Sequence, residues 1–417
     1  MTDYTEAGFD QFLERSLAVS APLPFEDGSI EAPLLKGDSV RTTTIKNVVV
    51  SEAKLYPQFL SGSFSVTYSS PVYVDANGYI YLTLYVCEGS GFGGVSIKVY
   101  RSTNSGATWS LLGEAISLSG YTTLYSDRIS LAVDSNGLVG VLFKAKDTTN
   151  YPNCENLFFS LYNGSSFNTP QAVSTGNNSN YTYALPTNLR VDTDNRWHVS
   201  WMWKTPEYPT IPSVFYNSRS ADTGGAWNTM ANLDVQAWYG VESPLGAAPQ
   251  LIMDSNNYPH ILVADYANDQ LREMTNKTGS WVSNISSYRF IYPEYITIDT
   301  SDTIYISDSG SASTAVIAVN SGGAWSDFAL VSTTNQCQLT IYGSNSVYLL
   351  EGDDLASTWK VHKYNRSNDT WTTYTVYSEV APSVLWVLIQ RRLTSPKYLE
   401  FKEGKYTLET FPSITYA

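Results

Sequence analysis

Five segments of this chain share one pattern, in which an apolar run ends in an aspartate, a polar turn follows, and a second apolar run begins. The copies include SPVYVDANGYIYLTLY, ISLAVDSNGLVGVLFK and PQLIMDSNNYPHILVAD, and the marker aspartates are Asp75, Asp134, Asp192, Asp254 and Asp299. Apolar alternation on both sides indicates two strands, and the Gly, Asn, Ser or Asp residues after each marker tolerate tight-turn dihedrals. The marker carboxylate can also accept local backbone hydrogen bonds. The pattern therefore predicts five β-hairpins of one kind.

A second pattern adds a strand, a loop of Gly and polar residues, and an aromatic residue that opens a further strand. Its clearest loops, STNSGATW and SADTGGAW, fit the Asp-box pattern Ser-x-Asp/Asn-x-Gly-x-Thr-Trp, with the Thr absent from the second. Within these loops we expect the Asp or Asn to cap the turn, the Gly to take a positive φ and the Trp to pack a sheet edge. Weaker copies end in Phe167, Trp281, Trp325 and Trp371. The structural Asp-box positions are Ser102, Asn104, Gly106, Trp109, Ser220, Asp222, Gly224 and Trp227.

Together the two patterns form a four-stranded unit that recurs along residues 61–378 and predicts an all-β fold. A six- or seven-bladed β-propeller is the economical arrangement, because an open row of sheets would expose long strand edges that radial closure removes. Residues 379–417 hold three more strand-like runs, SVLWVLIQ, KYLEFKEG and KYTLETF. They are expected either to build part of a seventh blade, closed by an N-terminal strand such as FSVTYSS, or to form a separate cap.

Residues 1–60 differ from the rest and are expected to form an attachment and oligomerisation segment. The run TEAGFDQFLERSLA places its apolar residues on one face of a short amphipathic helix, which either anchors the chain in an assembly or folds onto its own domain. Residues 29–55 then repeat with a period of ten. Two apolar residues per repeat cannot bury a core within one chain, so we expect copies of this stalk to pack together. The apolar positions are Ile30, Leu35, Val40, Ile45, Val50 and Leu55.

The run DGSIEAPLLKGDSVRTTTIKN resembles the short imperfect repeats in the stalks of trimeric bacteriophage tail fibres. This resemblance implies a homo-oligomer, with a trimer expected, that joins other virion proteins through its N-terminus. The alternative is an extended arm whose period is accidental.

The net charge and composition limit the classes of partner and ligand that we expect for this chain. The formal net charge of −14 argues against binding nucleic acid by phosphate neutralisation, and no Lys/Arg-rich stripe is present. The first residues are acidic and lack the apolar stretch of a signal peptide, and no run is long enough for a membrane span. The three cysteines have no spacing typical of a disulfide framework or zinc site, and no EF-hand-like series occurs. We therefore expect no metal, no cofactor and no membrane insertion.

The segment DTDNRWHVSWMWK, followed by SVFYNSRSADTGGAW, resembles the BNR-repeat family that includes ulvan-type polysaccharide lyases, as does the glycine-rich EGSGFGGVSIKVYRS. The resemblance implies a propeller and, for the lyases, a base beside a uronate carboxylate together with a cation that neutralises it. Here Lys204 stands where the family has Arg, and the family's Asn-His pair is absent. His198 and His260 lie within strand alternations, which favours structural roles. A sialidase reading fares no better, because the Phe-Arg-Ile-Pro motif is missing, although Arg190 lies near an expected strand start.

Aromatic residues supply the remaining functional clue. The chain has 31 tyrosines and 11 tryptophans, whose flat faces and polar tips suit stacking on sugar rings. We expect some of those in and after the third unit to line a glycan groove; the alternative is that they pack between blades. The candidate ligand-binding residues are Trp201, Trp203, Lys204, Tyr208, Tyr216 and Trp238.

These observations lead to one functional hypothesis and two alternatives. The hypothesis is a bacteriophage virion appendage, made in the host cytoplasm, that binds host surface polysaccharide multivalently through its propeller. The first alternative is a polysaccharide depolymerase of the lyase type, which the missing residues disfavour, and the second is a non-catalytic structural adaptor of the virion.

Overall fold

The described part of the chain is entirely β-structure, with no helix among these residues. Residues 1–63, which contain the expected helix and stalk, lie outside it. The computed structural model describes residues 64–75, 77–88, 95–104, 108–116, 121–122, 129–151, 155–175, 182–186, 189–204, 212–220, 224–236, 249–265, 270–285, 293–299, 301–311, 314–321, 324–332, 337–342, 346–353, 358–365, 370–377, 385–388, 397–402 and 405–410.

The first three sheets are antiparallel, and the innermost strand of the second and third is divided in two. In the first sheet the order is β1 (Phe64–Val74), β2 (Ile80–Glu88), β3 (Val95–Ser102) and β4 (Ser110–Ile116). The second contains β5 (Tyr121–Thr122) and β6 (Ser130–Val133), both paired with β7 (Val139–Asp147), then β8 (Asn156–Tyr162) and β9 (Gln171–Ala172). The third contains β10 (Thr182–Pro186) and β11 (Arg190–Val191), both paired with β12 (Trp197–Lys204), then β13 (Ser213–Arg219) and β14 (Ala231–Gln236).

Three four-stranded sheets and one three-stranded sheet follow. The fourth contains β15 (Gln250–Met253), β16 (Pro259–Asp265), β17 (Gln270–Thr275) and β18 (Val282–Ile285). The fifth contains β19 (Pro293–Ile298), β20 (Ile304–Ser311), β21 (Thr314–Ser321) and β22 (Ala324–Ser332). The sixth contains β23 (Cys337–Tyr342), β24 (Ser346–Asp353), β25 (Thr358–Asn365) and β26 (Thr370–Tyr377). The last contains β27 (Leu385–Leu388), β28 (Lys397–Lys402) and β29 (Lys405–Thr410).

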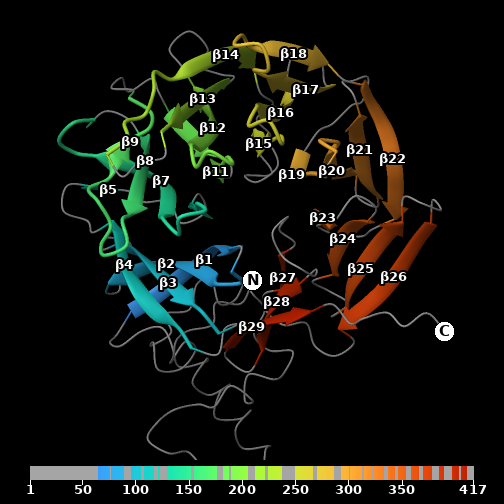
Figure 1. Ribbon diagram of the computed structural model, residues 1–417, viewed down its shortest axis with the longest axis horizontal. Helices are drawn as coiled ribbons and strands as arrows, with labels where there is room; N and C mark the ends of the chain where they lie inside the picture. The colour runs from blue at the N-terminus through green and yellow to red at the C-terminus, as the bar shows by residue number, and fades with distance from the viewer. Residues whose placement is uncertain are drawn as a thin grey trace, which may run out of the picture.

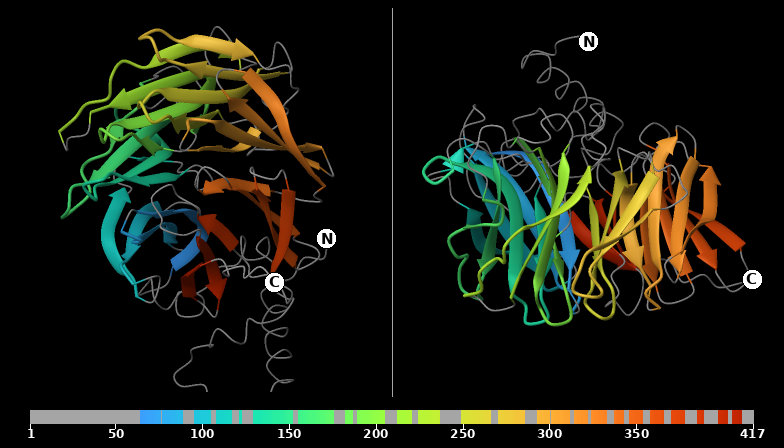
Figure 2. Two further views of the ribbon diagram at one scale, coloured as in Figure 1. Left: turned by 45° about the vertical axis from the view of Figure 1, so that its right-hand side comes forward. Right: turned by 90° about the horizontal axis from the view of Figure 1, so that it is seen from above.

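The sheets follow one another in chain order around a common centre (Figure 1). Their strands run along the short axis of this ring, so that neighbouring sheets stand face to face (Figure 2). Each innermost strand contacts the innermost strand of the next sheet, from β1 to β6, β11, β15, β19, β23 and β27, and β27 contacts β1. The described sheets therefore form a closed ring.

The C-terminal strands differ from one expectation. The run FSVTYSS does not complete the last sheet, because it is the first half of β1 and pairs with β2 in the first sheet. The last sheet consists of three described strands and lies between the sixth and the first. Among the described residues, the ring closes by packing of β27 on β1.

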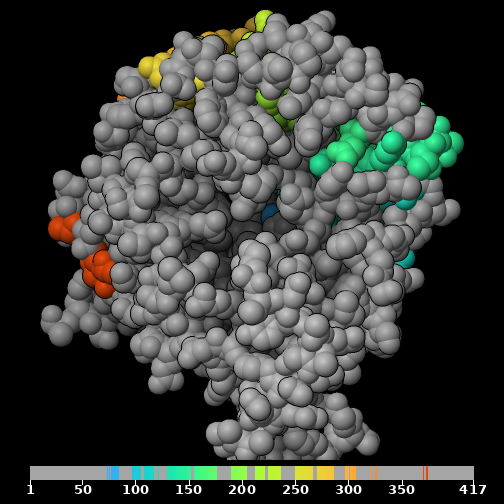
Figure 3. All heavy atoms as spheres, turned by 180° about the vertical axis from the view of Figure 1, so that it is seen from behind, coloured from blue at the N-terminus to red at the C-terminus, as the bar shows by residue number. Residues whose placement is uncertain are grey.

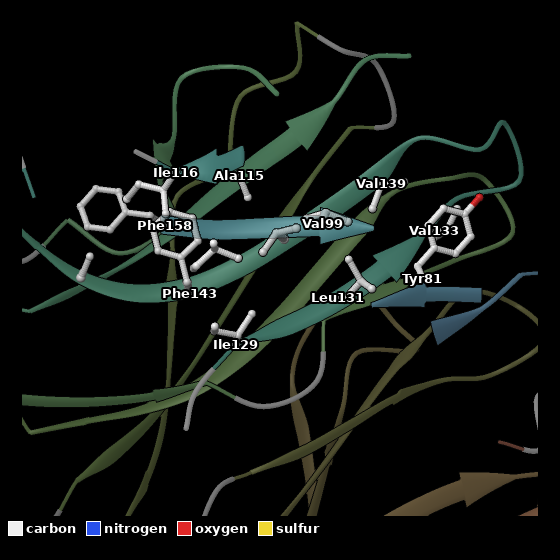
Figure 4. Packing of buried hydrophobic residues seen from close by; sticks show 13 residues of the cluster. Tyr81, Val99, Ala115, Ile116, Ile129, Leu131, Val133, Val139, Phe143 and Phe158 are labelled. Carbon is white, nitrogen blue, oxygen red and sulfur yellow. The ribbon is translucent and has the colours of Figure 1, made fainter. Parts of the chain in front are cut away.

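The core lies between the sheets. Val99, Ile116, Leu131 and Phe143 belong to a cluster that joins the first sheet to the second (Figure 4). Similar clusters join the second sheet to the third, the third to the fourth, and the fourth to the fifth. Because each of these sheets packs on a neighbour, apolar side chains on the middle strands are buried on both faces.

The five marker aspartates form five equivalent hairpin turns, as the sequence predicts. In each turn one carboxylate oxygen accepts hydrogen bonds from the backbone N–H groups two and four residues later, at 2.8–2.9 Å. In the third turn, the described bond is the one from the N–H of Arg196, four residues after Asp192. The residue three positions after the aspartate has a positive φ of 60–81° in all five turns. Gly, Asn or Asp occupies that position because these residues tolerate the left-handed region; the set is Gly78, Gly137, Asn195, Asn257 and Asp302.

Hydrogen bonds join successive turns of the second to fifth sheets. The residue after one marker aspartate donates its backbone N–H and its hydroxyl to the side chain of the positive-φ residue in the next turn. The pairs are Ser135 with Asn195, Thr193 with Asn257 and Ser255 with Asp302, at 2.5–2.9 Å. The turns therefore connect sheet to sheet at one end of the ring.

Candidate functional site

The first Asp-box loop has the expected geometry. The N–H of Thr108 donates to Oδ1 of Asn104 at 2.8 Å, and the Ser102 hydroxyl donates to the same oxygen at 3.0 Å. In the second loop Trp227 forms a β-bridge with Arg219 and stacks edge-to-face on Phe159 of the second sheet. Gly106 and Asp222 lie outside the described residues. The prediction of a positive φ for the loop glycine is wrong at Gly224, whose φ lies outside the left-handed region. The described residues of both loops stabilise the sheets and the turns between their outer strands.

His198 lies in a buried chain of three polar side chains. Its Nε2 is 3.0 Å from Oδ2 of Asp192, and its Nδ1 is 2.6 Å from the hydroxyl of Tyr216. This arrangement resembles an acid–base relay in outline. However, burial, the largest effect, raises the pKa of Tyr216 to about 12. A phenol of that pKa is protonated at neutral pH and acts as a hydrogen-bond donor.

His260 occupies the equivalent position in the fourth sheet. Its Nδ1 lies 2.6 Å from Oε1 of Glu273, and its Nε2 lies 3.4 Å from Oδ2 of Asp254. The other oxygen of Glu273 accepts hydrogen bonds from Asn320 and Trp325 of the fifth sheet. His260 and Glu273 therefore hold two sheets together.

Both histidines belong to a structural pattern that recurs in other sheets. The residue six positions after a marker aspartate donates to its second carboxylate oxygen in the first and fifth sheets too, where it is a tyrosine. Tyr81 donates to Asp75 at 3.1 Å, and Tyr305 donates to Asp299 at 3.2 Å. The structural role expected for His198 and His260 follows from this repeat.

The second sheet departs from the pattern. Gly140 stands where the other sheets have His or Tyr, and Oδ2 of Asp134 is buried without a hydrogen-bond partner. A Cβ at Gly140 would lie 2.4 Å from the Trp197 ring and 2.7 Å from the Phe159 ring. Because Trp197 of the third sheet fills this space, no donor side chain fits there. Burial raises the pKa of Asp134.

The expectation that Trp201 and Trp203 line a glycan groove is wrong. Both side chains are fully buried between the second and third sheets, where each packs against Phe215. They have no free face for a sugar ring. Tyr216 is partly buried and lies against Trp281.

Three other candidates remain predictions. The Lys204 backbone ends β12, and its side chain lies outside the described part, as do Tyr208 and Trp238. Of the sequence-predicted groove residues, the described structure places the side chains of Trp201, Trp203 and Tyr216, and the two tryptophans are buried.

A cluster that the sequence analysis did not single out lies at the opposite end of the sheets from the marker turns. Tyr121 pairs with Asp147 where β7 ends, and Tyr151 follows in the same turn. Both tyrosines are partly exposed and pack against Phe158, with ring centroids 5.1 Å and 6.5 Å away. A polar turn, DTTNY, directly after an apolar strand is the signal that would have located them. We call Tyr121, Asp147 and Tyr151 the rim cluster.

The rim cluster combines an ionised acceptor with a protonated donor. Burial alone would raise the pKa of Asp147, but hydrogen bonds from the Asn150 backbone and amide and from the Thr149 N–H together lower it. Burial and the Asp147 carboxylate raise the pKa of Tyr121. At neutral pH the cluster therefore offers aromatic surface, a hydroxyl donor and a carboxylate acceptor. This set suits a hydroxyl-rich ligand.

Two charge pairs lie at the same end of the ring. The buried Lys144 of β7 lies 3.3 Å from Glu155, and Arg272 binds Asp265 at the end of β16. The described residues contain no group of three or more His, Cys, Asp or Glu side chains placed to hold a metal ion. Among the same residues, no helix is long and apolar enough to cross a membrane.

Comparison with known proteins identifies solved structures of similar fold. No family model matches the sequence, and no curated protein matches it. Among solved structures, polysaccharide lyase Uly1 aligns over 92% of this chain and 96% of its own, with a TM-score of 0.51 and 11% identity. An α-L-arabinanase from Penicillium chrysogenum aligns over 74% of this chain and 92% of its own, at TM-score 0.43 and 12% identity. A sialidase from Trypanosoma rangeli aligns over 72% and 53%, at TM-score 0.42 and 12% identity.

The likeness to Uly1 is one of fold. It extends over nearly the whole of both chains and agrees with the ring of antiparallel sheets, which is the propeller-like architecture expected from the repeats. Fold does not determine chemistry, so the function has to be argued from the side chains of this chain.

Proposed function

We propose that this protein is a bacteriophage virion appendage that recognises a host surface polysaccharide through a seven-bladed propeller. The seven described sheets and the contact between β27 and β1 support this blade count. Structures of similar fold include proteins named for action on glycans, a polysaccharide lyase among them. Carbohydrate is therefore the first ligand class to test.

The rim cluster carries this proposal. Tyr121 and Tyr151 keep part of their ring surface exposed, in contrast to the tryptophans of β12. Stacking of a sugar ring on an aromatic face, with hydroxyls bonded to a neighbouring carboxylate, is a common mode of glycan recognition. Asp147 still has acceptor capacity, because an ionised carboxylate has about four lone-pair sites and three are used here.

The N-terminal segment supplies multivalency in this proposal. The stalk formed by residues 29–55 would join three chains, and residues 1–60 would attach the trimer to other virion proteins. Three weak sites on one stalk bind a repeating polysaccharide far more tightly than one site does. Light scattering on the full chain tests this: about three times 46.2 kDa is expected. A mass of one chain would contradict the stalk.

Binding to an array of bacterial surface polysaccharides tests recognition. The full-length protein should bind a restricted set, and the Tyr121→Ala/Tyr151→Ala double variant should lose about tenfold or more in affinity, since each aromatic contact contributes about 0.5–1.5 kcal/mol. The matched control is Tyr258→Ala, because Tyr258 is 36% exposed but lies in a marker turn at the other end of the sheets. The control should bind like the wild type.

The same experiment separates the alternatives. A blank array would contradict recognition and favour a structural adaptor. Following ultraviolet absorbance with acidic polysaccharides separates binding from cleavage, because a lyase must release unsaturated products. We expect no such products, and their appearance would favour a depolymerase.

A further inference from the structure

The rim cluster holds a negative charge that is not part of any ion pair among the described residues. Asp147 accepts hydrogen bonds from the backbone N–H groups of Thr149 and Asn150 and from the Asn150 amide, at 2.8–2.9 Å. Such a set of donors favours the ionised carboxylate. The described ion pairs do not include Asp147. Because the residue is only 6% exposed, water screens its charge less than at an open surface.

The lysines near this end of β7 lie on the other face of the strand. Side chains alternate along a strand, so Lys144 and Lys146 share a face with Leu142, which packs toward the third sheet. The Lys144 ammonium is already bound to Glu155, at 3.3 Å. Asp147 lies on the face toward the first sheet. An acidic sugar at the rim cluster would therefore meet a carboxylate without a lysine of β7 on the same face.

Three aromatic rings lie beside this carboxylate. Tyr121 packs edge-to-face on Phe158, with ring planes 82° apart, and the Tyr151 ring is tilted by 56° to the same ring. Both tyrosines are partly exposed, whereas Phe158 is buried in the cluster of Figure 4. Described atoms of the second sheet, coloured green, form part of the face of the molecule seen in Figure 3. Aromatic faces next to a carboxylate attract an organic cation, through cation–π contact and through the charge.

We propose that the rim cluster selects sugars that carry a protonated amine over acidic sugars. An ammonium group can contact the tyrosine faces and donate to the remaining acceptor site of Asp147, and hydrogen bonds between charged groups are the stronger ones. The formal net charge of −14 acts in the same direction, because it attracts cationic ligands and repels polyanions. This inference rests on the proposed glycan recognition and names the class of sugar that the same site takes.

Calorimetric titration of the full-length protein with three matched oligosaccharides tests the proposal. The probes are a hexamer of β-1,4-linked glucosamine, the same hexamer with every amine acetylated, and a hexamer of mannuronate. Titration at pH 6 keeps the amines protonated, and about 0.15 M NaCl screens long-range attraction to the acidic chain. The wild type should bind the glucosamine hexamer about tenfold or more tightly than the acetylated one. We expect the mannuronate hexamer to bind least.

Two aspartate variants separate the site from the general charge of the chain. Asp147→Asn removes the charge of the rim cluster and should make the affinities for the glucosamine and acetylated hexamers nearly equal. The matched control is Asp194→Asn, which changes the net charge by the same amount. The Asp194 side chain is 59% exposed in a marker turn at the other end of the sheets, so this variant should keep the preference. Should Asp147→Asn not fold, the Tyr121→Ala/Tyr151→Ala variant replaces it, because loss of the rings should also remove the preference.

The outcomes for this inference and for the proposed function can be told apart. Failure of the wild type to bind the glucosamine hexamer, or equally tight binding of another hexamer, would overturn the inference, as would a preference that persists in Asp147→Asn. The proposed function still stands in these cases if the polysaccharide array shows restricted binding that the double tyrosine variant loses. Selective binding of the glucosamine hexamer with a blank array would support the amine site and contradict recognition of a host polysaccharide.

Discussion

Asp134 and Asp192 occupy the same place in two equivalent turns and differ in one contact. In both, Oδ1 accepts a backbone N–H bond from the residue four positions later, at 2.8 Å. Oδ2 of Asp192 is bonded to His198, whereas Oδ2 of Asp134 is buried without a partner. Replacing each aspartate by asparagine keeps an oxygen for the turn and removes the charge. The pair of variants therefore isolates the contribution of the second oxygen.

We expect the two substitutions to act in opposite directions. Asp192→Asn loses a hydrogen bond to a charged group in a buried site, which costs about 1.5–3 kcal/mol. Asp134→Asn removes a buried negative charge whose Oδ2 atom has no donor, so its free energy of unfolding should be unchanged or higher by up to about 1 kcal/mol. The measurement is the urea midpoint of each full-length variant at pH 7, followed by tryptophan fluorescence, with the slope checked against the wild type.

The pH dependence supplies a second test. Although burial opposes ionisation of Asp192, the His198 hydrogen bond and further bonds lower its pKa on balance. Ionised Asp192 therefore stabilises the fold at pH values above its unfolded-state pKa of about 3.9. This contribution is lost as the pH falls through its lower folded-state pKa. Asp134 has a raised pKa, so its ionised form destabilises the fold at neutral pH, and the penalty disappears as pH falls through the folded pKa. Equal loss of stability in both variants at pH 7 would refute the importance of the Oδ2 partner.

Three further substitutions test the packing and the turns by thermal unfolding. Gly140→Ala should cost about 1–3 kcal/mol, because its Cβ would overlap the Trp197 ring, and an unchanged midpoint would contradict the packing. Asn195→Gly should lower stability by about 1 kcal/mol through loss of the Ser135 bonds, and Asn195→Ala should lower it further because alanine resists a φ of 62°; the reverse order would exclude backbone strain. Glu273→Gln should cost about 1.5–3 kcal/mol by weakening its contact with His260, and a neutral result would show that the pair does not join the sheets.

The fold was largely predictable because its strongest signals are local. Each marker turn needs Asp at one position and Gly, Asn or Asp three residues later. The turn can therefore be recognised in the sequence, where it occurs five times. The number of strands in the last sheet was not predictable in the same way. Whether FSVTYSS pairs with its sequence neighbour or with the C-terminal strands is a choice between two partners with similar strand propensity. The structure places it in β1, beside β2.

The burial of Trp201 and Trp203, two of the candidate ligand residues, follows from the arrangement of the sheets in the ring. In β12, Trp197, Val199, Trp201 and Trp203 occupy every second position, as expected for a sheet with one buried face and one solvent-exposed face. In a ring of sheets standing face to face, however, both faces of a middle strand are covered by neighbours. These four side chains pack against the second sheet, and Met202 on the other face packs against the fourth. The aromatic residues along the strands therefore reflect packing between sheets. Surface for a ligand remains where strands end, which is where Tyr121 and Tyr151 lie. Residues at these positions follow no period, and sequence alternation could not have distinguished them.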